Sequence, residues 1–191
     1  MKMSIPVFGG WARSRIGDTQ KRWSSLTRIE SLMWRKRARF AARMLAGQSG
    51  VADLGCGWMI LQRYLDHSTN YVPVDLIARD PRTIICDFNR EPPPKTGVPA
   101  AACLGLLGYL DRPDQFMNSL SQLHRLAVVS YKVRDADPPG LDRRSEALVN
   151  DLSSTEIEAL FKGAGWNITT AVWFDTRQIL WSLSSTRASA A

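Results

Sequence analysis

Short apolar runs alternate with helix-like or turn-rich segments over most of this chain, and this alternation constrains the fold more than any other feature. Runs of β-branched, aromatic or small apolar residues predict strands at 51–55, 71–76, 83–88, 100–106, 126–132, 167–174 and 178–184. Amphipathic segments between them predict helices at 58–65, 113–125 and 153–166. Strands that alternate with helices favour a mainly parallel sheet covered by helices, which predicts an α/β fold.

The length of 191 residues suits a single domain that buries its own core. We expect three stretches within it: a basic N-terminal arm and helix over 1–47, a core over 48–183 and a frayed tail over 184–191. The first stretch would belong to the same domain as the core, and it could act as a lid.

The cysteines and the apolar segments indicate a reducing compartment. Cys56, Cys86 and Cys103 lie in apolar stretches, as buried thiols do. Their odd number and wide spacing argue against a disulfide framework or a zinc knuckle. The N-terminus lacks the apolar core of a signal peptide, and the longest apolar run, 98–110, falls short of the ~20 residues that cross a bilayer. We therefore expect a cytoplasmic protein with no transmembrane segment and no bound metal.

A glycine-rich turn, Gly55-Cys56-Gly57, follows the first predicted strand and precedes the first predicted helix. Glycine allows a positive φ and lets the backbone approach a ligand closely. In open α/β sheets, ligands bind beyond the carboxyl ends of the strands, which is where this turn falls. A tight turn without a ligand would have the same sequence, so the glycines leave both interpretations open.

Acidic residues near the ends of three successive strands favour a nucleoside ligand. Asp75 ends the second strand, where a carboxylate can accept hydrogen bonds from both hydroxyls of a ribose. Asp87 ends the third strand, where it could meet the amino group of an adenine, with Phe88 beside the ring. Asp53 would repel a pyrophosphate but suits a cationic amino group, and Ile60 replaces the third glycine of a dinucleotide motif. Each acid alone could equally be a turn residue or a helix cap.

Four segments together resemble a known family. "VADLGCG" looks like the first motif of class I S-adenosylmethionine (SAM)-dependent methyltransferases, and "PVDL" and "CDFN" fall where that family has its ribose and adenine acids. "CLGLLGYLDRPDQF" resembles the family's segment after the fourth strand, and "LSSTEIEALFKGAGW" resembles its late helix. The likeness covers about residues 48–183. It implies a three-layer, doubly wound sheet with an antiparallel last strand, preceded by an N-terminal helical segment, and SAM as the cofactor.

The resemblance also implies a set of cofactor-binding residues. The amino-acid end of SAM would lie at Asp53 and the turn Gly55, Cys56 and Gly57; the ribose at Asp75; the adenine at Leu76, Asp87 and Phe88; and the methionine portion at Leu106. One departure from the family is the short spacing between the second and third strands. It predicts a turn at 77–83 where the family has a helix.

Methyl transfer from a sulfonium mainly requires alignment of the nucleophile, the methyl group and the sulfur. A general base is needed only when the acceptor is a hydroxyl or a protonated amine. Tyr109 and Tyr131 follow the fourth and fifth strands, so they are the candidate catalytic residues. Packing with an exposed hydroxyl is an equally good interpretation of both. His67 and His124 are expected at the surface.

The positive charge gathers at the N-terminus. Residues 1–50 hold 11 Lys/Arg and two acids, whereas acids slightly outnumber bases in the rest. A helix capped by Asp18 or Thr19 and ending at Gly47 would carry most of these bases. It could be a solvated helix packed over the sheet, a wall of the acceptor pocket that favours anions, or a grip for nucleic acid.

The sequence therefore predicts a SAM-dependent methyltransferase that acts on a small-molecule or glycan acceptor, which could be anionic. Two alternatives remain open: an RNA methyltransferase that uses the basic N-terminal segment, and a non-catalytic module that binds the cofactor. Nucleic acid is the less favoured partner, because no RNA-binding module is recognisable. The oligomeric state is not predicted.

Overall fold

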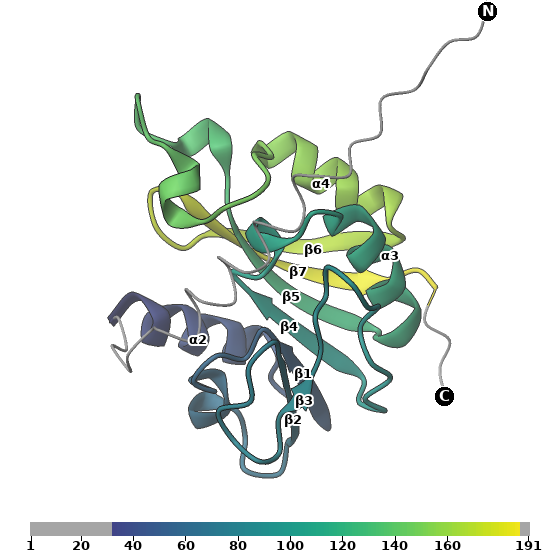
Figure 1. Cartoon of the computed structure of the whole chain (residues 1–191). Helices are drawn as coiled ribbons and strands as arrows, with labels where there is room; N and C mark the ends of the chain where they lie inside the picture. Colours follow the sequence, from purple (N-terminus) through teal and green to yellow (C-terminus); the bar gives the residue numbers. More distant parts are fainter. Residues whose placement is uncertain (1–31, 188–191) are drawn as a thin grey trace, which may run out of the picture.

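The computed structural model of this chain describes residues 32–187, in which the seven predicted strands pair into one sheet (Figure 1). The strands are β1 Gly50–Leu54, β2 Asn70–Asp75, β3 Ile84–Ile85, β4 Ala100–Leu104, β5 Leu126–Lys132, β6 Trp166–Trp173 and β7 Gln178–Ser185. Their order is β3-β2-β1-β4-β5-β7-β6. Neighbours from β3 to β5 are parallel, whereas β7 is antiparallel to both β5 and β6. The predicted sheet, with its antiparallel last strand, is confirmed.

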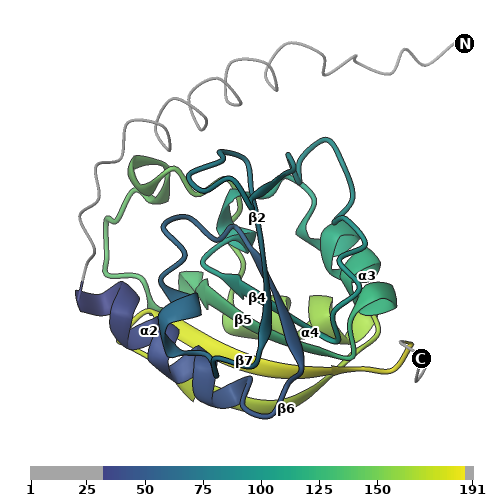
Figure 2. The ribbon, with the colours of Figure 1, turned by 90° about the horizontal axis from the view of Figure 1, so that it is seen from below.

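Helices cover both faces of the sheet and give the predicted three layers (Figure 1, Figure 2). One face carries α2, Leu32–Met44, and the other carries α3, Pro113–Leu123, and α4, Ser154–Gly163. Side chains of a strand alternate between the faces. In β1, Val51 joins the core cluster under α2, while Ala52 joins the cluster under α3 and α4.

Small side chains let α2 lie close to the sheet. Ala38, Ala41 and Ala42 are buried, and they share a core cluster with Ala100 and Ala102 of β4. Part of the predicted N-terminal segment is therefore integral to the core. The exposed side of the helix carries four of its five basic residues, Arg35, Lys36, Arg39 and Arg43, whereas Arg37 is half-buried.

The later helices begin as the sequence predicts. Pro113 occupies the first turn of α3, where its missing N–H costs no hydrogen bond. Ser153 caps α4, and Glu156 completes a capping box: the Ser153 hydroxyl accepts from the Glu156 N–H, and the Glu156 carboxylate accepts from the Ser153 N–H. These local signals fix both helix starts.

The predicted helix at 58–65 is wrong. Turns fill its first half, and a short 3-10 helix, η1 Leu61–Tyr64, is all that follows. The reason is the backbone: Met59 has φ +54°, a left-handed conformation that cannot continue a right-handed α-helix. Leu65 is already extended. By contrast, the predicted turn at 77–83 is confirmed.

Two boundaries also differ from the predictions. The expected helix end at Gly47 falls three residues after the last residue of α2, in a turn where Gly47 has φ +78°. The expected helix start at Asp18 or Thr19 lies outside the described residues. At the other end, β7 runs through Ser185, whose hydroxyl donates to the Ser121 carbonyl at 2.6 Å. β7 therefore extends into the stretch that the sequence analysis expected to fray.

The two edges of the sheet are unequal. β3 keeps two residues of the predicted 83–88, so Asp87 lies in the turn beyond it. β6 is eight residues long, and its register with β7 shifts between Ile168 and Thr170.

No helix within 32–187 is long and apolar enough to cross a membrane.

His124 is a correction to the expected surface position. It is 1% exposed, and its Nδ1 lies 2.9 Å from the Val98 carbonyl oxygen. Burial lowers the pKa of His124, so the neutral ring is favoured. The ring fastens the loop before β4 to the end of α3. His67 is exposed, as expected. The three cysteines are free and buried, also as expected.

Candidate functional site

A pocket of about 380 Å³ lies beyond the carboxyl ends of β1, β2, β4 and β5. Ligands bind at this edge in open α/β sheets, and the volume falls in the range of small-molecule sites. Every site residue predicted from the sequence contributes to its wall: Asp53, Gly55, Cys56, Gly57, Asp75, Leu76, Asp87, Phe88, Leu106, Tyr109 and Tyr131.

The glycine turn needs both of its glycines for backbone reasons. Gly55 has φ +75° and Gly57 has φ +51°, conformations that side-chain-bearing residues rarely adopt. A Cβ on Gly55 would also lie 3.2 Å from Leu106 Cδ1, whereas a Cβ on Gly57 would meet open space. The turn is anchored to β2, because the Gly55 N–H donates to the Val74 carbonyl at 2.8 Å.

Asp75 fixes the other end of this turn. One of its carboxylate oxygens accepts from the Gly57 N–H at 2.8 Å, and the other accepts from the Ile77 N–H at 3.0 Å. Arg79 adds a cation 3.6 Å away. Each carboxylate oxygen can accept more than one hydrogen bond. Asp75 can therefore hold the turn and still accept from a ligand hydroxyl.

Asp53 is a buried acid with one strong partner. It is 3% exposed, and the Tyr71 hydroxyl donates to it at 2.6 Å. Burial raises the pKa of Asp53 to about 7, even though the hydrogen bond from Tyr71 and the charge of Arg37 oppose this rise. The sequence analysis missed Tyr71. The one signal in the sequence was the two-residue period of strands. It places Val51 and Asp53 of β1 on the same face as the residues next to them in β2.

The side of the pocket beyond β3 is organised around Asp87 and its neighbours. The Phe88 ring packs edge-on against Phe116 with 5.2 Å between the ring centroids. Asn89 was missed by the sequence analysis. Its Nδ2 donates to the Tyr109 carbonyl at 3.0 Å, and its Oδ1 accepts from the Asp111 N–H at 2.8 Å. Asn89 thus ties the loop after β3 to the loop after β4.

The two candidate tyrosines differ in burial. Tyr131 is 1% exposed, and its hydroxyl donates to Asn150 Oδ1 at 2.6 Å while accepting from the Leu152 N–H and from Arg143. Burial raises the pKa of Tyr131. These bonds occupy its hydroxyl with groups of its own chain. Tyr109 is half-buried beside the pocket.

An ion-pair cluster forms the wall beyond β5, and the sequence analysis missed it. Glu146 accepts from Lys132 at 3.0 Å and from Arg177 at 2.9 Å. Hydrogen bonds from these two cations lower the pKa of Glu146 to about 2. Lys132, Glu146 and Gln178 all line the pocket. The wall therefore offers fixed charges and an amide to a ligand, but no carboxylate that could take up a proton near neutral pH.

The first half of α2 closes the pocket from the other face. Trp34, Arg37 and Ala38 line it. The Arg37 guanidinium lies over the end of β4, because a Cβ on Gly105 would be 2.8 Å from Arg37 Nη1. The sequence analysis treated the basic residues of this segment as a group and did not single out Arg37.

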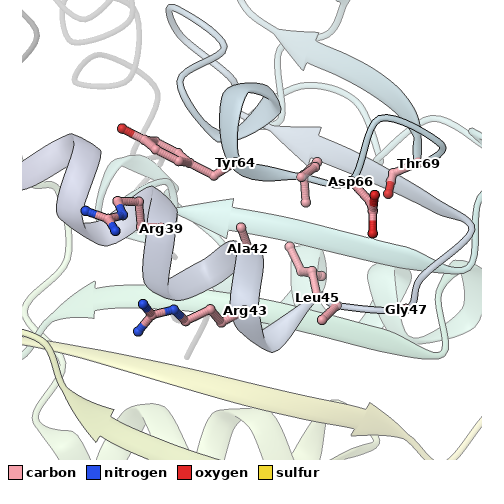
Figure 3. A pocket seen from close by; sticks show the side chains of 10 residues that line it. Arg39, Ala42, Arg43, Leu45, Gly47, Tyr64, Asp66 and Thr69 are labelled. Carbon is pink, nitrogen blue, oxygen red and sulfur yellow. The ribbon is translucent and has the colours of Figure 1, made fainter.

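A second pocket, of about 280 Å³, runs between α2 and the turns around η1 (Figure 3). Arg39, Arg43 and Tyr64 line one end, and Asp66 and Thr69 line the other. In Figure 3 both arginine side chains extend away from Asp66 and Thr69. None of the predicted site residues lies in this pocket, so it is not the candidate site.

Known proteins resemble this chain in structure but not in sequence. Neither a scan against models of protein families nor a search of curated proteins finds a match. Among solved structures, the N-methyltransferase NodS from Bradyrhizobium japonicum WM9, crystallised with S-adenosylhomocysteine (SAH), is similar with a TM-score of 0.68 and 10% identity, covering 88% of this chain and 97% of that one.

Two further structures show the same fold. One is the 1,6-didemethyltoxoflavin-N1-methyltransferase of Burkholderia thailandensis, bound to 1,6-didemethyltoxoflavin and SAH, with a TM-score of 0.67, 14% identity and coverage of 97% and 93% of the two chains. The other is human N-acetylserotonin methyltransferase in complex with SAM, with a TM-score of 0.64, 14% identity and coverage of 95% of this chain and 60% of that one.

Proposed function

We propose that this chain, which has the fold of class I methyltransferases, is a SAM-dependent methyltransferase. One observation carries the proposal: residues at or near the carboxyl ends of four strands, selected from the sequence as cofactor residues, line a single pocket at the edge of the sheet where this fold binds ligands.

The pocket residues fit the chemistry of SAM. In our proposal, Asp53 and the turn at Gly55–Gly57 receive the amino-acid end of the cofactor, and Asp75 receives the ribose hydroxyls. Leu76, Asp87 and Phe88 receive the adenine, and Leu106 lies along the methionine portion. Gly55 and Leu106 lie next to each other, because a Cβ on Gly55 would be 3.2 Å from Leu106 Cδ1.

When bound, SAM supplies an electrophilic methyl group on a sulfonium. The protein's contribution is then to align the acceptor and to exclude water. Glu146 is a poor general base, because its pKa of about 2 reflects the two cations that hold it. The hydroxyl of Tyr131 is occupied by three partners. Tyr109, which is half-buried in the wall of the pocket, is our candidate for contact with the acceptor.

We propose a small-molecule or glycan acceptor with an anionic group. The support is local: Arg37 lines a pocket of about 380 Å³ and forms no ion pair with a carboxylate of residues 32–187, whereas the charge of Lys132 is balanced by Glu146. An RNA acceptor is the second candidate, supported by the exposed basic side of α2. The free, buried thiols support our proposal of a cytoplasmic location.

Calorimetry with SAM and SAH tests the cofactor. We expect both to bind, and the absence of heat at millimolar ligand would refute the proposal. Formation of SAH from SAM with a panel of small acids, glycans and RNA then tests the acceptor. Turnover with RNA, lost steeply as salt is raised, would favour the second candidate. Tight SAM binding without turnover on any acceptor would favour a non-catalytic module.

A further inference from the structure

The exposed side of α2 carries a row of arginines. The helix contains five basic residues and no acidic one. Arg35, Arg39 and Arg43 recur every four residues and are all exposed, so they lie in one row along the helix. At about 1.5 Å per residue, the row is roughly 12 Å long. No carboxylate within residues 32–187 lies at ion-pair distance from Arg39 or Arg43, so their charges can attract an anion.

The row ends at the second pocket (Figure 3). Arg39 and Arg43 line this pocket together with Tyr64, which η1 contributes. In Figure 3 the Tyr64 ring and the two guanidinium groups extend toward the same side, away from Asp66. The carboxylate of Asp66 repels a negative group, so an anion is favoured at the arginine end, on the side of the aromatic ring.

Arginines that share a pocket with an aromatic ring suit a nucleotide. Arginine binds phosphate through the N–H groups of its planar fork, and a nucleobase can stack on a tyrosine ring. A free nucleotide would contact only the residues of the pocket, whereas the row continues past the pocket to Arg35 and can follow a longer strand. The Asp66 carboxylate can accept from a ribose 2′-hydroxyl, which RNA has and DNA lacks. These features favour single-stranded RNA.

An anionic membrane fits the same charges less well. A helix that binds the surface of a bilayer buries its apolar face in the lipid. In α2 that face is already packed on the sheet, because Ala38, Ala41 and Ala42 are buried in the core. Tyr64 is half-buried in the wall of a pocket, so a flexible strand can reach it more readily than a flat lipid surface can.

We propose that Arg35, Arg39 and Arg43 bind the phosphates of single-stranded RNA and that Tyr64 stacks against one of its bases. The first half of α2 lines the candidate site and the second half lines the second pocket, so a strand bound to the row passes beside the candidate site. None of the four residues lines the candidate site itself. The inference therefore goes beyond the proposed function, and it holds whether or not RNA is the methyl acceptor.

The test measures RNA binding by the full-length protein. Fluorescence anisotropy follows a labelled single-stranded RNA of mixed sequence over a range of salt concentrations. The variants are the double substitution Arg39→Gln/Arg43→Gln and the single substitution Tyr64→Leu. A control double substitution, Lys95→Gln/Lys162→Gln, removes the same charge from exposed positions outside α2. Circular dichroism and thermal unfolding check that each variant is folded.

We expect the arginine double variant to bind RNA about tenfold or more weakly. The slope of log K against log salt concentration should fall by roughly 1.4, because two phosphate contacts are lost. Tyr64→Leu should weaken binding about fivefold or more and leave the slope unchanged, since stacking releases no counterions. The lysine double variant should match the parent in both affinity and slope.

The absence of RNA binding by the parent, or equal losses in the two double variants, would overturn the proposal. Affinities for AMP or for vesicles of phosphatidylserine that equal the affinity for RNA would assign the row to a free nucleotide or to lipid instead. Equal affinity for single-stranded DNA of the same sequence would contradict the assignment to RNA. Failure of the parent to bind SAH would refute only the proposed function.

Discussion

The hydroxyl of Tyr71 on β2 donates a 2.6 Å hydrogen bond to the carboxylate of Asp53 on β1, and it does so inside the protein, beneath the candidate pocket. The two side chains share a face because Tyr71 is paired with Val51, two residues before Asp53. The hydrogen bond from Tyr71 thereby holds the Asp53 carboxylate in one orientation. It also favours the ionised form of Asp53, which is the form that can pair with an ammonium group.

Cofactor binding should depend on the protonation of Asp53. Its pKa in the free protein is about 7, so the charged carboxylate is lost as the pH falls below that value. We expect SAH to bind several-fold more weakly at about pH 6 than at about pH 8. Calorimetry at both values measures the difference. Asp53→Asn should bind weakly at both, and an unchanged pH dependence in that variant would assign the effect to another group.

The same pKa predicts how the stability of the free protein varies with pH. An unfolded aspartate titrates near 3.9, so the folded protein, with a pKa of about 7, holds the Asp53 proton more tightly. The stability that Asp53 contributes is therefore full below about pH 4 and is lost as the pH rises through 7. Urea unfolding at several pH values should show a weaker decline between pH 4 and 7 in Asp53→Asn. Parallel curves for parent and variant would contradict this.

Asp75→Ala should weaken SAH binding by about tenfold or more. Each charge-assisted hydrogen bond to a ribose hydroxyl contributes roughly 1.5–3 kcal/mol, and the variant also releases the Gly57 N–H that Asp75 accepts from. Circular dichroism should show an intact fold. Asp66→Ala, an exposed acid of the second pocket, serves as the control. An unchanged dissociation constant for Asp75→Ala would remove this acid from the site.

Gly55→Ala and Gly97→Ala form a matched pair. Both glycines have φ above +70°, so alanine at either position should cost roughly 1 kcal/mol of folding stability or more. Only at Gly55 would the new Cβ press on a neighbour, because Gly97 faces open space. We therefore expect similar losses of stability but reduced SAH affinity only in Gly55→Ala. Equal SAH affinities in the two variants would show that the space beside Gly55 and Leu106 does not matter for binding.

A chain that begins at Gly47 should lose much of its stability. It would lack α2, whose Ala38, Ala41 and Ala42 pack under β1 and β4. It would also lack Arg37 and the other pocket residues of that helix. Thermal unfolding followed by circular dichroism should show a lower midpoint, and SAM-dependent transfer should be absent. A stable, fully active protein would mean that the N-terminal segment is only an appendage.

Local patterns predicted the sheet well. Strand positions follow from runs of apolar residues, and the start of α4 follows from Ser153 and Glu156 alone. Local patterns could not exclude the helix that was predicted after the glycine turn, at 58–65. Its apolar residues suit a helix, and only the left-handed backbone at Met59 shows why none forms. Such a conformation is imposed by tertiary packing rather than by the residue type.

Long-range contacts account for the residues that were missed. His124 looks like a polar residue at a helix end, and its burial depends on a carbonyl 26 residues earlier in the chain. Arg37 is one of several bases on α2, and only the packing of Ala38 and its neighbours decides which of them points inward. Tyr71 required the strand register. A sequence pattern predicts which face of a helix or strand is buried, whereas the contacts of a single side chain depend on how the elements pack together.

The unequal edges of the sheet bear on how the protein avoids self-association. An edge strand exposes unpaired N–H and C=O groups that can recruit a foreign strand. β3 presents a template of only two residues, although Ile85 is 65% exposed. β6 is long enough to recruit a strand, but the shifted register between Ile168 and Thr170 interrupts its pairing pattern, as a β-bulge does. One edge is thus short and the other irregular, two features that disfavour the addition of a strand from another copy.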